Sequence, residues 1–250
     1  MPLNNIPTLL VVAHPDDEWV LLGHLKHLTK VHILIISDCG EQHTTRTQET
    51  YAALKYFGLD ADVVTFLSDH KSIPDTRAIE HVHDIANFIR QKIEDLHIEQ
   101  IVSHDFEAGH PDHDAAHLAS LIAARSMGCA LMCYPMYRVS PSGILLMFAP
   151  LAKSTATEDV TKLCYTRRDL TALFISAFVY KTQKFAMGIL ATYGLISLIY
   201  RRGLLLRNVE RGLLLTPPRE DALSIRRYGV SLVTYNALIA TINDDRAAPV

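Results

Sequence analysis

Short apolar runs alternate with longer amphipathic segments through the first half of the chain. The runs are rich in Val, Ile and Leu and carry few charges, as is typical of strands buried on both faces. The pattern predicts strands at Thr8–Ala13, Val31–Ser37, Asp62–Leu67, Gln100–Ser103 and Ala130–Tyr134. It predicts helices at Asp17–Thr29, Arg46–Phe57 and Arg77–Leu96, and a further helix that begins at Pro111.

This alternation also predicts the fold class. Strands that alternate with helices build βαβ units, and these form an open, mostly parallel sheet with helices on both faces. We expect a Rossmann-like α/β fold with a strand order of about 3-2-1-4-5. In such sheets, ligands bind beyond the carboxyl ends of the strands, where the strand order reverses. The first and fourth strands would be neighbours at that point.

The pattern weakens beyond Pro135. Further strands are predicted at Gly143–Ala149 and Val160–Tyr165, and one or two helices at Arg167–Tyr200. Within the latter, Phe185–Tyr200 has sixteen residues without a charge, fewer than the roughly 20 that a spanning helix needs. We therefore expect a buried helix there and no membrane span. The predicted domains are a core, 1–183, and a helical C-terminal extension, 184–250, packed on the core or at a subunit interface.

Two leucine triplets in this extension, Leu204–Leu206 and Leu213–Leu215, are bordered by arginines. One interpretation is a helical cap that buries its leucines on the sheet or on a second subunit. The other is a peripheral membrane contact, with the arginines on anionic head groups. We favour the cap or the interface of a homo-oligomer.

Composition narrows the functional classes. The chain has 250 residues, a net charge of −3 and no basic tract of the kind that binds nucleic acid. Its four cysteines form no Cys-x-x-Cys pair, and its first residues do not have the pattern of a signal peptide. We therefore expect a cytoplasmic protein with reduced thiols. No glycine-rich loop follows the first strand, which argues against a nucleotide-binding protein.

Two histidine-containing motifs follow predicted strands. Ala13-His14-Pro15-Asp16-Asp17-Glu18 comes after the first strand, and His110-Pro111-Asp112-His113 comes after the fourth. Proline followed by acidic residues is also a common way to begin a helix, so either motif alone is readily interpreted as a helix start. Two such starts at neighbouring strand ends, each led by histidine, instead predict a functional site.

The residue types in these motifs suit a divalent metal with an open coordination position. His14 and Asp17 are three residues apart at a helix start, so their side chains can face the same way. His113 would supply a third ligand, and imidazole with carboxylate is a donor set that Zn²⁺ accepts. Asp16 could then take a proton from water, while His110 stabilises an oxyanion or protonates a leaving amine. This inventory predicts a metal-dependent hydrolase.

The two motifs resemble the diagnostic blocks of a known family, the PIG-L/LmbE-like zinc-dependent deacetylases of N-acetylglucosamine compounds. The resemblance spans Leu9 to Gln183, and Lys184–Val250 does not align. It continues between and after the motifs, in Gly40-Glu41, Arg46, Glu49, Gly58 and the segment Tyr180-Lys181-Thr182-Gln183, where Thr182 stands for the serine of the family.

The resemblance implies roles for the residues of both motifs. His14, Asp17 and His113 would bind Zn²⁺, with another divalent metal such as Fe²⁺ as an alternative. Asp16 would be the general base, and His110 would assist the oxyanion or the leaving group.

Two further roles follow from the same resemblance. Asp112 would tune His110 as a neighbouring carboxylate. The residue that matches Arg46 tends to contact the substrate, although Arg46 and Glu49 could equally form an ion pair on an exposed helix.

Other residues near the second motif are alternatives. His117 lies four residues after His113, a spacing that also suits a metal pair on a helix, but the family pattern uses only the earlier histidine. His104 and Asp105 end the fourth strand, and of the two we expect Asp105 to approach the site.

The sequence thus predicts an enzyme that removes the N-acetyl group from an N-acetylglucosamine-type conjugate, a small-molecule substrate, and releases acetate and a free amine. One alternative is an amidase that cleaves another amide, such as that of a thiol conjugate, at the same site. Another is a catalytically silent sugar-binding homologue. The intact Asp16, Asp17, His110 and His113 argue against this last alternative.

Overall fold

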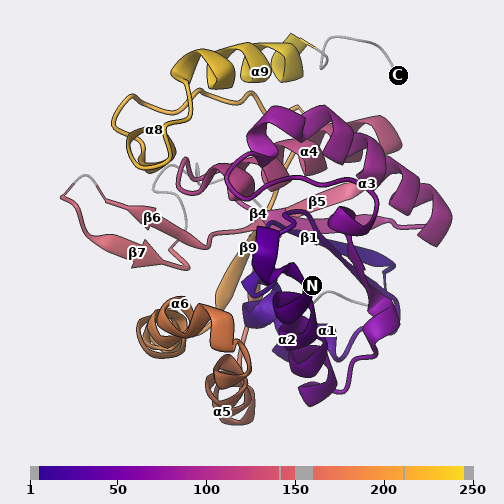
Figure 1. Ribbon diagram of the computed structural model, residues 1–250, viewed down its shortest axis with the longest axis vertical. Helices are drawn as coiled ribbons and strands as arrows, with labels where there is room; N and C mark the ends of the chain where they lie inside the picture. The colour runs from indigo at the N-terminus through magenta and orange to yellow at the C-terminus, as the bar shows by residue number, and fades with distance from the viewer. Residues whose placement is uncertain (1–5, 141, 150–159, 211, 245–250) are drawn as a thin grey trace.

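A seven-stranded sheet forms the centre of the computed structural model, which describes residues 6–140, 142–149, 160–210 and 212–244. Its order is β3-β2-β1-β4-β5-β9-β8, and helices cover both faces (Figure 1). The first five strands are parallel to one another: β1 (Thr8–Val12), β2 (Val31–Ile35), β3 (Val64–Phe66), β4 (Gln100–His104) and β5 (Ala130–Tyr134). The predicted fold class and strand order are confirmed.

Strand β1 shows why the sheet is buried on both faces. Its side chains alternate between the faces, as the two-residue period of a strand requires. Leu10 and Val12 pack in one apolar cluster with α1 (Leu22–Leu25), α2 (His43–Tyr56) and the helices that follow β8. Leu9 and Val11 pack in the other cluster, with helices α3 (Val82–Leu96), α4 (Pro111–Met127) and α9 (Leu232–Asp244).

Both motifs form helix starts, but of different kinds. The helix predicted at Asp17–Thr29 is instead a 3₁₀ segment, Asp17–Leu21, followed by the single turn of α1. Helix α4 begins at Pro111 as predicted, with His110 as its N-cap. Proline fits this first position because its fixed φ is helical and its missing N–H would be unpaired there in any case.

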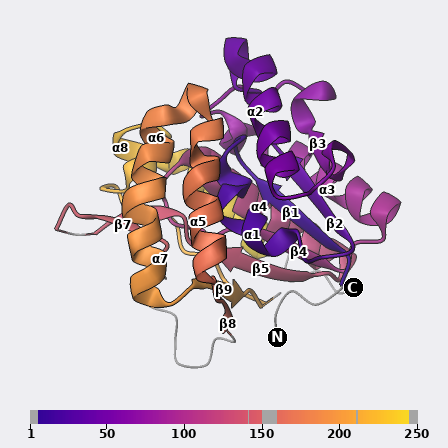
Figure 2. The ribbon, with the colours of Figure 1, turned by 90° about the horizontal axis from the view of Figure 1, so that it is seen from below.

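The second half of the chain departs further from the prediction. The strand predicted at Gly143–Ala149 is β7 (Leu145–Met147), which pairs with β6 (Tyr137–Val139) in a separate hairpin outside the main sheet. Beyond it lie β8 (Val160–Leu163) and α5 (Arg167–Ser176). Helix α6 (Lys184–Ile189), a π-helical turn and α7 (Leu195–Arg201) then form one helical stretch beside α5 (Figure 2).

The expectation of a buried helix at Phe185–Tyr200 is therefore only half right. Met187 and Leu198 are buried, whereas Phe185, Ile196 and Tyr200 are exposed. The segment has enough apolar residues to cover the sheet on one side and to remain apolar on the other. Among the described residues, no helix combines the length and the hydropathy of a membrane-spanning segment.

The first leucine triplet does not form a helix. Leu204–Asn208 is β9, an antiparallel strand between β5 and β8, with Leu204 and Leu206 fully buried. The predicted helical extension thus contributes one strand to the sheet as well as α8 (Leu223–Arg226) and α9. The second triplet lies in a segment without helix or strand. The domain boundary between residues 183 and 184 remains a prediction.

Gly203 makes the approach of β9 to β8 possible. Its φ of 139° is disfavoured for other residues, and a Cβ there would lie 2.3 Å from the backbone oxygen of Leu163. We expect Gly203→Ala to lower the free energy of unfolding by about 2–4 kcal/mol, through strain and overpacking together. Denaturant unfolding measures the change. Gly58→Ala is the matched control, because Gly58 has a φ of 76° with nothing within 4 Å. An equal loss in both variants would contradict a role for the close contact.

Candidate active site

The two motifs meet at the carboxyl ends of β1 and β4. These strands are paired neighbours, and the strand order reverses between them. His14, Asp16 and Asp17 follow β1, while His110 and His113 begin α4. Each of these side chains lines the same cavity. The structure therefore brings the predicted metal ligands and the predicted acid–base residues together.

Asp17 lies at the centre of the cluster. Its Oδ2 is 3.3 Å from His14 Nδ1, and 3.4 Å from the Nε2 atoms of both His104 and His113. The same oxygen accepts the backbone N–H of His14 at 2.8 Å. Burial would raise the pKa of Asp17, but His113 and His104 lower it well below its usual range. Asp17 is thus held as a carboxylate among three imidazoles.

The donor atoms of this cluster fit a divalent cation. His14, His110 and His113 can each offer a nitrogen, and these atoms lie within 4.8 Å of one another. Asp17, His104 and His113 meet the same limit. A buried carboxylate between imidazoles is the donor chemistry of zinc and related ions. The predicted ligands His14, Asp17 and His113 fall in these overlapping groups.

Asp16 has an unusual backbone conformation beside the cluster. Its φ of 127° is disfavoured for a residue with a side chain and costs about 1–3 kcal/mol. Arg46 Nη2 donates to Pro15 O at 2.6 Å and to Asp16 Oδ1 at 3.2 Å. The Asp16 N–H donates to Glu18 Oε2 at 2.8 Å. Burial raises the pKa of Asp16 to about 8, although Arg46 opposes the shift.

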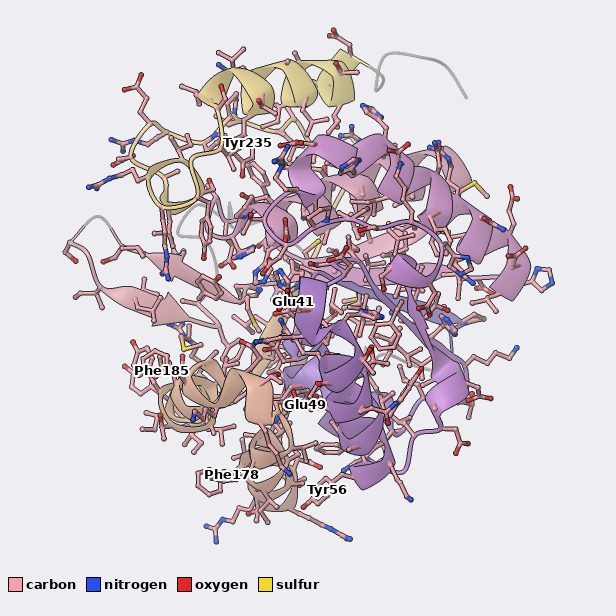
Figure 3. The ribbon with its side chains drawn as sticks, viewed as in Figure 1. Glu41, Glu49, Tyr56, Phe178, Phe185 and Tyr235 are labelled. Carbon is pink, nitrogen blue, oxygen red and sulfur yellow. The ribbon has the colours of Figure 1, made fainter. Side chains whose placement is uncertain are left out.

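The late segment Tyr180–Gln183 secures these contacts from the other side. Tyr180 donates its hydroxyl to Glu18 Oε1 at 2.9 Å. The backbone N–H and the hydroxyl of Thr182 both donate to Glu49. Figure 3 labels Glu49 on α2, facing the helices that follow β8. Arg46 and Glu49 are both buried, so the alternative of an ion pair on an exposed helix is wrong.

Asp112 is predicted to face His110, but its carboxylate lies elsewhere. Its carboxylate accepts the backbone N–H groups of Thr76 and Ala78 at 2.7 and 3.0 Å, and it lies 3.1 Å from His14 Nε2. Only the backbone N–H of Asp112 points to His110, whose Nδ1 accepts it at 3.3 Å. The two backbone N–H groups of the loop after β3 hold the Asp112 carboxylate beside His14, so it orients His14 instead of His110.

His104, rather than Asp105, approaches the site. The His104 ring stacks on His113 with centroids 4.1 Å apart, whereas Asp105 forms an ion pair with Arg207 of β9. Successive residues at a strand end point to opposite sides, and this alternation separates the two. His117 faces His104 O at 3.0 Å and Cys133 Sγ at 3.3 Å, so it lies outside the cluster that holds His113.

One residue of the cluster had no signal in the sequence. Asp75 lies in the loop after β3, and its Oδ1 is 3.0 Å from His14 Nε2. The hydrogen bond with His14 lowers the pKa of Asp75. Its only sequence cue is its position in a loop at the carboxyl end of a strand. Many loop aspartates share that position.

The comparisons with known proteins agree with this geometry. A family model described as "PIG-L: GlcNAc-PI de-N-acetylase" matches residues 9–124. Over this range, which includes both motifs, the chain is similar to the PIG-L family. The resemblance predicted from the two motifs is therefore confirmed. No curated protein is similar enough in sequence to match the chain.

Solved structures with the same fold include two deacetylases and a conserved protein. The A40926 pseudoaglycone deacetylase Dbv21 is 15% identical, with a TM-score of 0.56 over 82% of this chain and 96% of that chain. A zinc-inhibited form of teicoplanin deacetylase Orf2 is 15% identical, with a TM-score of 0.53 over 80% and 97%. The conserved protein TT1542 from Thermus thermophilus is 18% identical, with a TM-score of 0.55 over 86% and 99%. These likenesses show a shared fold.

The PIG-L match includes both motifs but ends before many of the residues that line the cavity, which has a volume of about 410 Å³. One wall is the β6–β7 hairpin, with Tyr137 and Leu145, and another is α6, with Phe185. The extension completes the cavity with Arg227 and Tyr228, whose ring lies 4.5 Å from that of His110. Sequence reasoning missed these residues because they lie outside the motifs.

Proposed function

We propose that the chain is a metal-dependent N-deacetylase that removes the acetyl group from an N-acetylated amino sugar conjugate and leaves a free amine. The observation that carries the proposal is the group of Asp16, Asp17, His110 and His113 in one cavity at the reversal of strand order. The description of the family model and the deacetylases of the same fold support it.

The metal would be held by His14, Asp17 and His113. Zn²⁺ is the ion that we propose, with Fe²⁺ as the alternative. When bound, the ion would polarise the acetyl carbonyl and favour the ionisation of water. One structure of the same fold is a zinc-inhibited form of its own protein, so the choice of ion needs a direct test.

Asp16 is the base in this proposal. Its carboxylate lines the cavity beside the proposed ligands, and Arg46 fixes one of its oxygens. Burial raises the pKa of Asp16 and Arg46 opposes the rise. A cation bound at the neighbouring ligands would also favour the carboxylate form that a base needs. Asp16 would take the proton of the attacking water as the new C–O bond forms, and would return that proton to the amide nitrogen as the C–N bond breaks, so that acetate and the free amine are released.

His110 would act on the other side of the amide. Burial and the neighbouring His14 and His113 lower the pKa of His110 to about 2, so its imidazole is neutral in the metal-free protein. Because Nδ1 accepts the Asp112 N–H, the remaining proton is assigned to Nε2. A neutral imidazole with this tautomer can donate a hydrogen bond to the developing oxyanion or the leaving amine.

The lining of the cavity supports a substrate with both polar and apolar parts. Arg46, Asp75 and Gln183 can bind sugar hydroxyls. Met136, Leu145 and Ile189 form an apolar wall, which suits a conjugate whose amino sugar is attached to an apolar group.

Acetate release from a panel of N-acetylglucosamine conjugates, with Zn²⁺, Fe²⁺ and other ions added to the metal-free protein, tests the function. We expect release with at least one ion and a preference for conjugates with an apolar aglycone. Release of a different acid from a thiol conjugate would favour the amidase alternative. Sugar binding without hydrolysis under every metal condition would contradict the enzyme proposal. The cytoplasmic location and the homo-oligomer remain predictions.

A further inference from the structure

Helices α5, α6 and α7 present an apolar face to solvent. Figure 3 labels two of its residues, Phe178 and Phe185, on the outside of this helical layer. Phe178 is 69% exposed, Phe185 80%, Ile196 62% and Tyr200 87%. Exposed phenylalanine and isoleucine are common singly but not in groups. The face is made up of Phe174, Ile175, Phe178, Phe185, Tyr193, Ile196, Ile199 and Tyr200, and we call it the outer helical face.

Within their own segment of the chain, the helices of this face carry basic residues at their ends. Between Leu170 and Val209 the sequence contains five Lys or Arg and no Asp or Glu. Arg207 is paired with Asp105 inside the protein. The others lie at the two ends of the α6–α7 stretch, Lys181 and Lys184 at its start and Arg201 and Arg202 at its end. Apolar and aromatic side chains between basic residues are typical of surfaces that lie on anionic lipid.

The outer helical face continues into the rim of the active-site cavity. Phe185 belongs to both, and Val139 and Leu145 of the hairpin also line the cavity while remaining exposed. The hairpin is tied to the helices, because Tyr193 donates its hydroxyl to Leu145 O at 2.9 Å and Ser197 donates to Met147 O at 2.6 Å. The cavity rim and the helical face therefore form one surface.

We propose that the outer helical face docks on an anionic phospholipid bilayer. Its phenylalanines and isoleucines would enter the boundary between head groups and acyl chains, and the four bordering basic residues would contact lipid phosphates. The cavity rim would then lie against the lipid. The docking does not depend on the proposed deacetylase activity.

A second copy of this chain is the competing occupant. A symmetric pair of outer helical faces would bring the same basic residues of both copies into one interface, without an acidic residue from Leu170 to Val209 on either side. Like charges across an interface oppose association, whereas the same charges favour an anionic membrane. The charge pattern therefore favours lipid.

Vesicle flotation of the full chain tests the proposal. The vesicles contain phosphatidylcholine alone or phosphatidylcholine with phosphatidylserine. We expect co-flotation with the anionic vesicles at low salt, and about tenfold less with neutral vesicles or at high salt, because the four basic residues contribute through screened electrostatics. The double variant F178D/I196D should lower co-flotation with anionic vesicles about tenfold or more, since it places charges among the inserted side chains.

Val233→Asp is the matched control. Val233 is 74% exposed on α9, and α9 lies on the opposite side of the molecule from α5 and α6 (Figure 1). This variant should float as the wild type does. Phe178 and Ile196 do not line the cavity, so F178D/I196D should keep acetate release from a water-soluble conjugate, and its thermal unfolding should match that of the wild type.

Three outcomes would overturn the docking proposal. The first is that the wild type does not float with anionic vesicles at low salt. The second is that F178D/I196D floats as well as the wild type. The third is that neither form floats, while sedimentation shows a wild-type dimer that F178D/I196D dissociates. Flotation of a wild type that releases no acetate from any conjugate would instead contradict the proposed function alone.

Discussion

Asn in place of Asp16 is expected to lower kcat by about 10³-fold while metal content stays at the wild-type level. The amide keeps the size of the carboxylate, and its oxygen can still accept the hydrogen bond that Arg46 donates to Asp16 Oδ1. It cannot take up a proton from water at neutral pH, so the base is lost and the fold is retained. Steady-state acetate release and metal analysis of the same preparation measure the two quantities.

Asp69→Asn serves as the control for this variant. Asp69 has an exposed side chain and does not line the cavity, so its amide should leave kcat unchanged. A near-normal kcat in Asp16→Asn would show that another group accepts the proton, and His110 would be the first to test.

Loss of either predicted histidine ligand should remove the metal. We expect His14→Ala and His113→Ala to weaken metal affinity by at least about 100-fold, since even residues that only orient a ligand cost about 10–100-fold. Each variant deletes an imidazole that faces Asp17 Oδ2 at 3.3 or 3.4 Å. Metal content after dialysis against a weak chelator gives the occupancy, and circular dichroism shows whether the fold remains.

His117→Ala distinguishes the ligand from its neighbour on α4. His117 hydrogen bonds with His104 O and faces Cys133, so its loss should cost stability but not metal. Full occupancy in both His14→Ala and His113→Ala, or loss of metal in His117→Ala, would contradict the proposed ligand set.

The part of the fold that the sequence predicts is the part with regular periodicity. Strand β1 is uninterrupted by charge because both of its faces are buried, and the same pattern identified four further parallel strands. Once the strand order is known, the positions of His14 and His110 after neighbouring strands follow from topology. This is why the meeting of the two motifs could be anticipated without coordinates.

The second half could not be predicted in the same way, because its pattern fits more than one environment. The run Leu204–Leu206 is uniformly apolar, so its hydrophobic pattern does not distinguish a strand from a helix. Its pairing with β8 and β5 makes it a strand. The uncharged run Phe185–Tyr200 similarly suits a buried helix and a helix with one exposed face.

Contacts between distant segments limit the prediction of the site. Asp75 reaches His14 across 61 residues of sequence, and Tyr228 reaches His110 from the extension. The choice between His104 and Asp105 depends on which side of the strand end each faces. None of these relations has a local signature, because each arises only when the chain has folded.

The position of β9 affects the order in which this chain can fold during synthesis. Strand β8 is paired with β9, and β9 is paired with β5. The edge of β5 therefore has its native partner only after Leu204–Asn208 has left the ribosome, although all five parallel strands have emerged about 70 residues earlier. In that interval the nascent chain exposes an unpaired strand edge, which is the feature most prone to pair with another chain. Helices α5 and α6 emerge between β5 and β9, but they pack on one face of the sheet and leave the backbone groups at the β5 edge unpaired.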